Sequence, residues 1–399
     1  MKLPFPAHNL SPEPIDPERL PRPSRREGPF APNEALRSAR RLFEGRVIGS
    51  ESVAVAPDGT LWMLDKWGHA WIATASPTAE GGYQLSPEPV AYIGPVRPLG
   101  FHHDAAGNLV VCDTKGLLRL EKTGSSSGGG SSSWQLRCLA NSAGGRPISY
   151  ANDLDISPTT GKIYFTDSTC IPPALNSAQP RPWYDTMRSY MLTMYHGAPT
   201  GRLLVHDPAT GTTEVLQEGL WFANGVALAP DESYVAVVET PSMRVRRRWL
   251  TGPKAGTLDT LIDGLPGFPD NINRGSDGSF WLAIVIPDVP LAHRILPSPF
   301  LRGLMARLPD WLIPKKQWGC VVKVSPEGEV LQVLMDPDGS RVSSVACAAE
   351  HDGKLWMGNL AGNYVSVLDL AQVAQSQAAA GAVRAERSSG GAGKAGVAS

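Results

Sequence analysis

Hydrophobic and polar positions follow one pattern that recurs along the chain. Each copy has a short alternating apolar strand, a turn containing Pro, Asp or Gly, and a second apolar strand. The clearest copies are NDLDISPTTGKIYFTD at 152–167 and NGVALAPDESYVAVVE at 224–239. The others span 51–65, 99–113, 270–284 and 345–359. Because such a unit is the inner hairpin of a propeller blade, six copies predict an all-β protein with a six-bladed β-propeller.

The repeats also predict the domain boundaries. Residues 1–45 are rich in Pro and Arg and have no periodic pattern, so we expect an extended N-terminal arm. Residues 46–370 form one propeller domain, and 371–399, rich in Ala, Gly and Ser, form a disordered tail. The first thirty residues lack the apolar core of a signal peptide, and no run approaches the roughly 20 apolar residues of a transmembrane helix. We therefore expect neither element, and the compartment stays open.

Two intervals between copies are long, and both contain a helix-like pattern at about 171–199 and 287–316. The first places these side chains on one helical face: Trp183, Met187, Tyr190, Met191 and Met194. The second does the same for Leu301, Leu304, Met305, Leu308 and Leu312. We expect both insertions to pack on one propeller face and cap its central opening. The alternative for 291–316 is an amphipathic helix that touches a membrane, with these basic side chains near the headgroups: Arg302, Arg307, Lys315 and Lys316.

Charge and cysteine content exclude several classes of protein. The formal net charge is -1, so the protein as a whole gives no argument for binding nucleic acid or an anionic membrane, and we expect no nucleic acid partner. The five cysteines are widely spaced and form no CxxC pair. This pattern fits neither a disulfide scaffold nor a zinc site. Most of them are expected to be buried thiols, and one disulfide remains an alternative.

One position in each copy, ahead of the turn, forms the central candidate site. The residues there are Glu51, Leu99, Asn152, Asn224, Asp270 and Val345. Innermost strands of a propeller run side by side around the axis, so equivalent positions form a ring. Four of these six side chains are oxygen donors, two carboxylates and two amides, which is the donor set that Ca²⁺ requires. Asn271, next to Asp270, is a further candidate ligand, and no Cys or His occupies the register to favour a softer metal.

Simpler explanations exist for each residue taken alone. Asn224-Gly225 and Asn152-Asp153 are common turn-forming pairs, and an acid ahead of a strand can simply be solvated. Neither explanation requires the residues to share one register. The coincidence of four oxygen donors at equivalent positions therefore favours a metal site.

A bound Ca²⁺ would polarise a carbonyl or phosphoryl oxygen for attack by water, and this chemistry needs a general base. His102 and His103 follow Leu99 on the second inner strand, so one of the two is expected to face the axis. Asp270 is a competing candidate for the base. The apolar ring positions and the Met-rich insertion indicate a small apolar substrate. No GxSxG motif indicates covalent catalysis.

Several segments resemble the strictosidine synthase-like family: FANGVALAPDES, LPGFPDNI, ANDLDISPTTGKIYFTD and AEHDGKLWMGN. The resemblance covers about 51–370 and implies a six-bladed propeller related to paraoxonases and gluconolactonases. Those hydrolases hold calcium with a glutamate, asparagines and an aspartate on inner strands. Glu51, Asn152, Asn224 and Asp270 match that set, and Asn271 matches a further paraoxonase ligand.

The chain departs from strictosidine synthase itself at the last blade. The synthase condenses tryptamine with secologanin and uses a glutamate just upstream of the last blade's turn. No acid occurs here between Asp338 and Glu350. We therefore expect a calcium-dependent hydrolase of lactones or aryl and alkyl esters. The alternatives are an amine–aldehyde condensation that uses another acid or base, and a non-catalytic propeller whose structural calcium supports binding of a partner or membrane.

Overall fold

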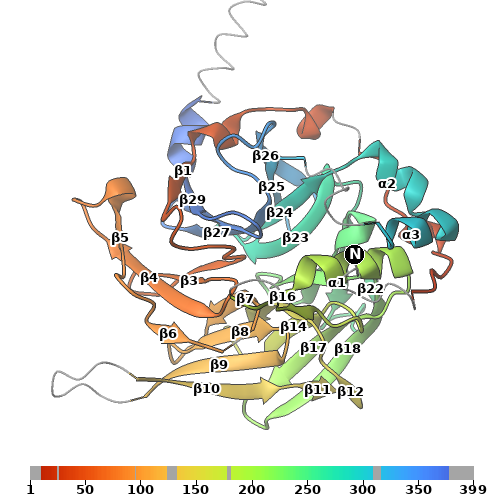
Figure 1. The fold of residues 1–399 in the computed structure, drawn as a ribbon, viewed down its shortest axis with the longest axis horizontal. Helices are drawn as coiled ribbons and strands as arrows, with labels where there is room; N and C mark the ends of the chain where they lie inside the picture. Colours follow the sequence, from red (N-terminus) through yellow and green to blue (C-terminus); the bar gives the residue numbers. More distant parts are fainter. Residues whose placement is uncertain are drawn as a thin grey trace, which may run out of the picture.

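Six antiparallel sheets of four or five strands are arranged around one axis in the computed structural model (Figure 1). The structure describes residues 10–24, 27–94, 96–123, 133–177, 181–308 and 316–376. Each predicted hairpin forms the two innermost strands of one sheet, which confirms the six-bladed β-propeller. The strands are mostly buried on both faces because each blade packs against two neighbours; in β20, for example, all positions are buried.

Blade 1 contains β2 (Val53–Val55), β3 (Leu61–Leu64), β4 (His69–Ala75) and β5 (Tyr83–Leu85), with β6 (Ala91–Tyr92) paired to β4. Blade 2 contains β7 (Pro98–His103), β8 (Leu109–Asp113), β9 (Gly116–Thr123) and β10 (Ser133–Ala140). Blade 3 contains β13 (Ala151–Ile156), β14 (Ile163–Asp167), β17 (Gly201–Asp207) and β18 (Thr212–Leu220). A short ribbon of β11 (Ser142–Ala143) and β12 (Arg146–Pro147) precedes blade 3.

Blade 4 contains β19 (Ala223–Leu228), β20 (Tyr234–Glu239), β21 (Arg244–Trp249) and β22 (Leu258–Ile262). Blade 5 contains β23 (Gly267–Arg274), β24 (Phe280–Pro287), β25 (Gly319–Val324) and β26 (Val330–Asp336). Blade 6 contains β27 (Val345–His351), β28 (Lys354–Asn359), β29 (Val365–Asp369) and β1 (Arg40–Leu42). The inner strands β2, β7, β13, β19, β23 and β27 each contact the next, and β27 contacts β2, so the ring is closed.

The N-terminal arm takes part in this closure, which corrects the predicted boundary at residue 46. Strand β1 pairs with β29, the Leu42 and Val365 positions lying opposite each other. The outermost strand of the last blade therefore comes from the start of the chain, and its hydrogen bonds join the two ends of the ring. Among the described residues before β1, the helical elements are the short 3₁₀ turns η2 (Pro17–Arg19), η3 (Gly28–Phe30) and η4 (Ala35–Ser38).

The C-terminal segment is only partly described. Residues 370–376 continue from β29 as helical turns, so the start of the predicted disordered tail is wrong. Residues 377–399, on which most of that prediction falls, lie outside the described residues. All five cysteines are described and are free thiols; Cys112, Cys320 and Cys347 are buried.

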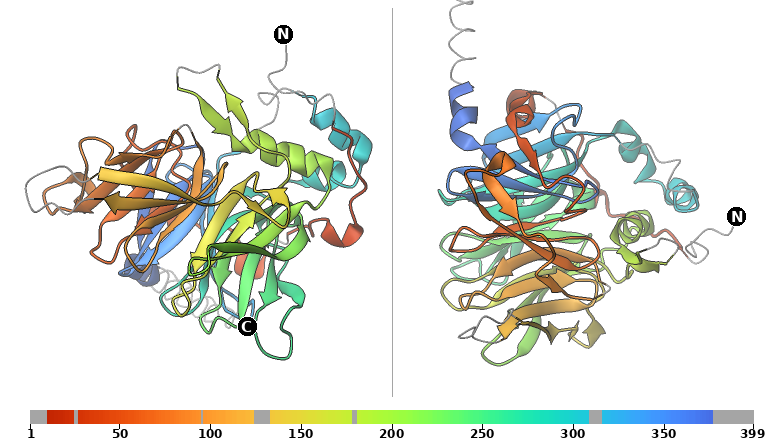
Figure 2. Two further views of the ribbon diagram at one scale, coloured as in Figure 1. Left: turned by 90° about the horizontal axis from the view of Figure 1, so that it is seen from below. Right: turned by 60° about the vertical axis from the view of Figure 1, so that its left-hand side comes forward.

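Both insertions lie on one face of the propeller (Figure 2). The first forms a hairpin, β15 (Ala174–Asn176) and β16 (Trp183–Asp185), followed by α1 (Thr186–His196). Asp185 caps α1 by accepting from the Arg188 amide, and Gly197 ends it with φ of 87°. Met187 and Tyr190 lie in this helix as predicted, but Trp183 belongs to β16.

The second insertion has two short helices, α2 (Pro290–Ile295) and α3 (Pro299–Met305), where the pattern predicted one. Pro299 begins α3, and proline disfavours helical backbone in the residue before it, which explains the break. Residues 309–315, including Leu312 and Lys315, lie outside the described residues. In the part of the chain that the structure describes, no helix is both long and apolar enough to cross a membrane.

Candidate metal centre

A β-bulge occurs in the inner strands at the level of the predicted ligands. The register shifts between Ala151 and Leu154 in β13, between Ala223 and Val226 in β19, and between Pro269 and Ile272 in β23. The residues inside these shifts include Asn152, Asn224, Asp270 and Asn271. A bulge redirects side chains that regular pairing would place between blades. The candidate ligands therefore lie at a defined irregularity and not within the regular ladder.

Four of the five predicted ligands line one small cavity on the axis: Glu51, Asn152, Asn224 and Asp270. All four are buried, with exposed fractions of 2–4%. The turn and solvated-acid explanations are therefore wrong, since Asn224 and Gly225 lie inside β19 and the two acids are inaccessible. The cavity has a volume of about 30 Å³. That is enough for an ion or one or two waters, but not for an organic substrate.

The asparagine side chains present oxygen, not nitrogen, as their unpaired atom. The Asn152 amide donates through Nδ2 to the Ser168 hydroxyl at 2.9 Å. The Asn224 amide donates through Nδ2 to Thr240 Oγ1 at 3.0 Å and to Asp270 Oδ1 at 2.6 Å. The Oδ1 atoms of both residues are buried without a hydrogen-bond partner. Buried polar atoms nearly always have a hydrogen-bond partner. Two unpaired amide oxygens at one cavity therefore indicate that a ligand binds there.

Asn271 repeats this pattern one residue further along β23. Its Nδ2 donates to Ser52 Oγ at 3.2 Å, and its Oδ1 is buried without a partner. Ser52 precedes β2 in blade 1, and blade 6 lies between blades 5 and 1, so the Asn271 side chain reaches past the neighbouring blade. Asn271 does not line the cavity itself. It stays a predicted ligand just beside the other four.

Burial disfavours the charged forms of the two carboxylates, Glu51 and Asp270. Burial raises the pKa of Asp270 to about 7, although the Asn224 hydrogen bond and the Arg97 guanidinium oppose the shift. Burial and the charge of Asp270 together raise the pKa of Glu51 well above its usual value. A cation between them would offset both effects.

The donor set fits a hard divalent cation on its chemistry. Two carboxylates supply the balancing charge, and the amide oxygens of Asn152, Asn224 and Asn271 are oriented, dehydrated and unpaired. Among the described residues there is no cluster of three or more His, Cys, Asp or Glu side chains that could hold a metal. A site here depends on the amide oxygens, and a soft metal has no ligands for it.

His102 and His103 lie at the other end of the channel, which corrects the predicted general base. They line the opposite mouth, a cavity of about 810 Å³ that also contains Asp155 and Arg274. The residue of β7 at the ring position is Leu99, and three residues of strand separate it from His102, which is about 10 Å. Neither histidine lines the cavity that contains Glu51 and Asp270. Of the three predicted catalytic residues, only Asp270 is at the candidate centre.

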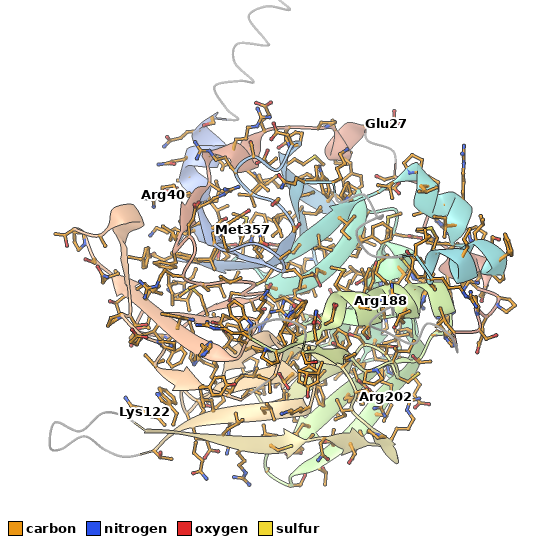
Figure 3. The ribbon with its side chains drawn as sticks, viewed as in Figure 1. Glu27, Arg40, Lys122, Arg188, Arg202 and Met357 are labelled. Carbon is orange, nitrogen blue, oxygen red and sulfur yellow. The ribbon has the colours of Figure 1, made fainter. Side chains whose placement is uncertain are left out.

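Two other acids that could compete as bases have structural partners. Asp167 forms an ion pair at 2.6 Å with Arg202, which is labelled in Figure 3, and accepts from the Tyr150 amide. Asp153 accepts from the Val226 amide at 3.1 Å and so links blades 3 and 4. Both carboxylates therefore use their oxygens to fix the positions of inner strands.

The structure identifies three supporting residues that the sequence pattern did not. Ser168 and Thr240 each orient an asparagine, and each lies 16 residues after it, directly behind the acid that ends the second strand. A comparison of that position between copies would have found them. Arg97 was missed because it precedes its repeat; its guanidinium is 2% exposed and donates to the Gly49 and Leu360 carbonyls.

An apolar lid covers the cavity. Tyr190 of α1 packs edge-on against Phe222, with ring centroids 4.8 Å apart, and Phe222 packs likewise against Tyr150 at 5.3 Å. Leu99 and Met187 belong to the same cluster. The first insertion therefore caps the candidate centre, and α1 would have to move to admit an organic molecule.

Comparison with known proteins gives the family. A family model described as strictosidine synthase matches residues 152–253, and one described as strictosidine synthase-like, N-terminal, matches 28–69. A gluconolactonase from Xanthomonas campestris covers 83% of this chain and 89% of its own, with a TM-score of 0.53. At 16% identity that likeness shows the fold alone.

Curated relatives match most of the chain. Adipocyte plasma membrane-associated protein from Salmo salar is 32% identical over 380 residues, which is 90% of this chain and 85% of that protein. Protein strictosidine synthase-like 10 from Arabidopsis thaliana is 33% identical over 373 residues, 86% of this chain and 92% of its own length. By this identity over nearly the whole chain, the protein belongs to the strictosidine synthase-like family.

Proposed function

We propose that this protein is a calcium-dependent hydrolase of lactones or aryl and alkyl esters. The proposed ligands are the five oxygen-donor side chains Glu51, Asn152, Asn224, Asp270 and Asn271. One observation carries the proposal: the amide oxygens of all three asparagines are buried without a hydrogen-bond partner beside two buried carboxylates. Structural asparagines would have both ends of the amide paired.

Calcium in this position supplies positive charge that stabilises an oxyanion on an ester or lactone carbonyl. The chain's own residues do the rest. Ser168 and Thr240 hold the amide oxygens of Asn152 and Asn224 in place. The aromatic rings of Tyr150, Tyr190 and Phe222 exclude water and select an apolar acyl or alkyl group. Asp270, which lines the cavity, is the proposed proton acceptor.

The lactone part of the proposal is supported by the propeller fold shared with the gluconolactonase. The condensation chemistry of strictosidine synthase has less support. No acid occurs between Asp338 and Glu350, where Ser343 and Ser344 precede β27 and Ala346 lies in it, so the carboxylate used by the synthase has no counterpart there.

A second candidate is a non-catalytic propeller with structural calcium. The observation in its favour is the size of the cavity, about 30 Å³ beneath the cluster of α1, which admits no substrate without movement. Both candidates share the metal site and differ in whether α1 opens.

The deciding experiment measures calcium binding and turnover on the same preparations. Calorimetry gives the calcium affinity, and hydrolysis of phenyl acetate and several lactones is measured with calcium and with chelator. The Asn224→Ala variant is expected to weaken calcium binding by about 100-fold or more and to abolish hydrolysis, because it removes a proposed ligand. The matched control is Asn273→Ala, a buried asparagine of β23 whose Oδ1 accepts from the Cys347 thiol; calcium affinity should not change.

The outcomes separate the candidates. Hydrolysis that persists in chelator, or in Asn224→Ala, contradicts the calcium-dependent hydrolase. Calcium binding that raises the melting temperature without any hydrolysis supports the structural role. Condensation of an amine with an aldehyde, without ester hydrolysis, supports the synthase-type alternative.

A further inference from the structure

The hairpin of α2 and α3 presents large apolar side chains to solvent. Leu291 is 55% exposed, Phe300 79% and Leu304 52%. Among the large hydrophobic side chains that the structure describes, Phe300 is the most exposed. Single exposed hydrophobic residues are ordinary, but three on one short hairpin indicate a contact surface.

The exposure is not the result of a loosely attached segment. Arg302 of α3 is fully buried and donates to the Tyr195 carbonyl at 2.9 Å and the His196 carbonyl at 3.0 Å, both at the end of α1. Arg188 of α1, labelled in Figure 3, donates in return to the Ala306 carbonyl at 2.8 Å. The hairpin is therefore fixed to α1, and its outward face is set by the fold. Arg302 points inward, so the expectation that it contacts headgroups is wrong.

The charges on the hairpin are of one sign. Arg294 and Arg307 are both exposed, and no acidic residue occurs between Val289 and Leu308. The acid immediately before this segment, Asp288, pairs with His293 at 2.7 Å. The outward face thus combines exposed apolar side chains with the positive charges of Arg294 and Arg307, in a protein whose formal net charge is only -1.

We propose that the α2–α3 hairpin docks this protein on the surface of a membrane that contains anionic lipids. Phe300, Leu291 and Leu304 enter the interfacial region, and Arg294 and Arg307 lie against the headgroups. The hairpin projects outward from the propeller face (Figure 2), a shape that suits a broad surface better than it suits a partner helix, which needs a groove. A second copy of the chain is the competing occupant, but two such hairpins would bring like charges together.

Docking in this way has a consequence for the candidate metal centre. The hairpin lies on the same face as α1, and α1 contacts α3 (Figure 2). The capped end of the channel would therefore face the lipid surface, where apolar molecules concentrate. The docking proposal itself does not depend on hydrolysis or on calcium.

Flotation of the full-length protein with vesicles tests the proposal. Binding is expected to vesicles of equimolar phosphatidylcholine and phosphatidylserine, to be weaker with phosphatidylcholine alone, and to fall at high salt. Phe300→Ser should weaken binding by about 30-fold, from the loss of one buried aromatic side chain. The matched control is Leu331→Ser, which alters a residue of β26 that is as exposed as Leu304, at 52%, and should bind normally.

A charge reversal completes the test. Arg294→Glu is expected to reduce binding to anionic vesicles, whereas Lys122→Glu on blade 2, far from the hairpin in Figure 3, should not. Circular dichroism and melting temperature check that each variant is folded. The proposal is overturned if Phe300→Ser and Leu331→Ser bind alike, if binding ignores lipid charge, or if sedimentation shows instead a dimer that Phe300→Ser dissociates.

Discussion

The Ser168 hydroxyl decides which end of the Asn152 amide faces the axis. Its one hydrogen is donated to the Ala223 carbonyl at 2.6 Å, so towards Asn152 it can only accept. Nδ2 must therefore point at Ser168, at 2.9 Å, and Oδ1 is left facing the cavity. For Asn224 the Asp270 carboxylate acts in the same way whenever it is ionised, because it too can only accept. The orientation of the Asn152 oxygen is thus imposed from outside the ring, whereas that of Asn224 depends in part on Asp270, another member of the ring.

Ser168→Ala is expected to free the Asn152 amide to rotate. Calcium binding should weaken by about tenfold, as is typical when a group that orients a ligand is lost. Stability should fall by about 1–3 kcal/mol, because the Ala223 carbonyl and the Asn152 amide lose their partner in a buried place. Calorimetry and urea denaturation measure the two effects.

Ser325→Ala is the matched control for that variant. Ser325 is also buried, and its hydroxyl accepts from the Glu327 and Glu329 amides in a turn of blade 5. The Ser325→Ala variant should be less stable than the unaltered protein but should bind calcium with the same affinity. Equal calcium affinity for Ser168→Ala and the unaltered protein would contradict the orienting role.

The raised pKa of Asp270, about 7 against an ordinary 3.8, predicts an unusual pH dependence of stability in chelator. Between these values the folded protein binds more protons than the unfolded chain, so stability falls as pH rises from about 4 to about 7. The pKa of Glu51 is raised as well and acts in the same direction. Urea denaturation in chelator across this range should show the fall, and Asp270→Asn should reduce it.

Calcium affinity should depend on pH in the opposite sense. The proposed ligands Glu51 and Asp270 must be ionised to bind, so protons compete with the metal below about pH 7. Calorimetry at pH 6 and pH 8 should show tighter binding at the higher pH, with protons released on binding. Affinity that stays constant over this range would be evidence against these two carboxylates as ligands.

Gly225 is required because the backbone of β23 passes directly over it. A Cβ at this position would lie 2.5 Å from the Ile272 amide nitrogen and 2.6 Å from the Asn271 Cα. These atoms cannot yield without separating β19 from β23, so Gly225→Ala should cost about 3 kcal/mol or more and weaken calcium binding. Thermal melting and calorimetry measure both.

Gly303→Ala, in α3, is the control for Gly225→Ala. Its Cβ would approach no atom closer than 3.4 Å, and alanine favours the helix, so stability should be unchanged or rise by a few tenths of a kcal/mol. If both variants lose a similar amount of stability, the close approach of the β23 backbone is not the reason for glycine at position 225.

Leu42 tests the closure of the ring. It is 4% exposed and packs with Val365 and Val367 of β29. Leu42→Ala should destabilise the protein by about 3 kcal/mol in urea denaturation, because the buried contact joins the two ends of the propeller. Its exposed neighbour on the same strand, Arg40, should tolerate alanine within about 0.5 kcal/mol. A small effect of Leu42→Ala would mean that β1 contributes little to closure.

Properties that repeat with the blades could be predicted from the sequence. The six hairpins and the register of Glu51, Asn152, Asn224 and Asp270 follow from one alternating pattern, because equivalent positions of a propeller meet at the axis. The same reasoning went wrong for His102. The alternation of apolar and polar residues predicts which face of β7 a side chain occupies. It does not predict at which end of the channel that side chain lies.

Other features could not be predicted because no local pattern encodes them. The pairing of β1 with β29 joins segments more than 300 residues apart, and such pairings leave no periodic signal at either end. Arg302 fits an amphipathic helix by its spacing, yet it is buried because the ends of α1 and the N-terminal arm offer it carbonyl oxygens.

By itself, then, the sequence determined the six-bladed architecture and the ring of oxygen donors, since both depend on a short period of apolar and polar residues. Tertiary structure decided which atoms of that ring are available. Ser168 and Thr240 turn the amide nitrogens away, and burial dehydrates the oxygens that remain. It also decided what covers the ring, because the position of α1 over the axis and the outward face of the α2–α3 hairpin depend on contacts between distant segments.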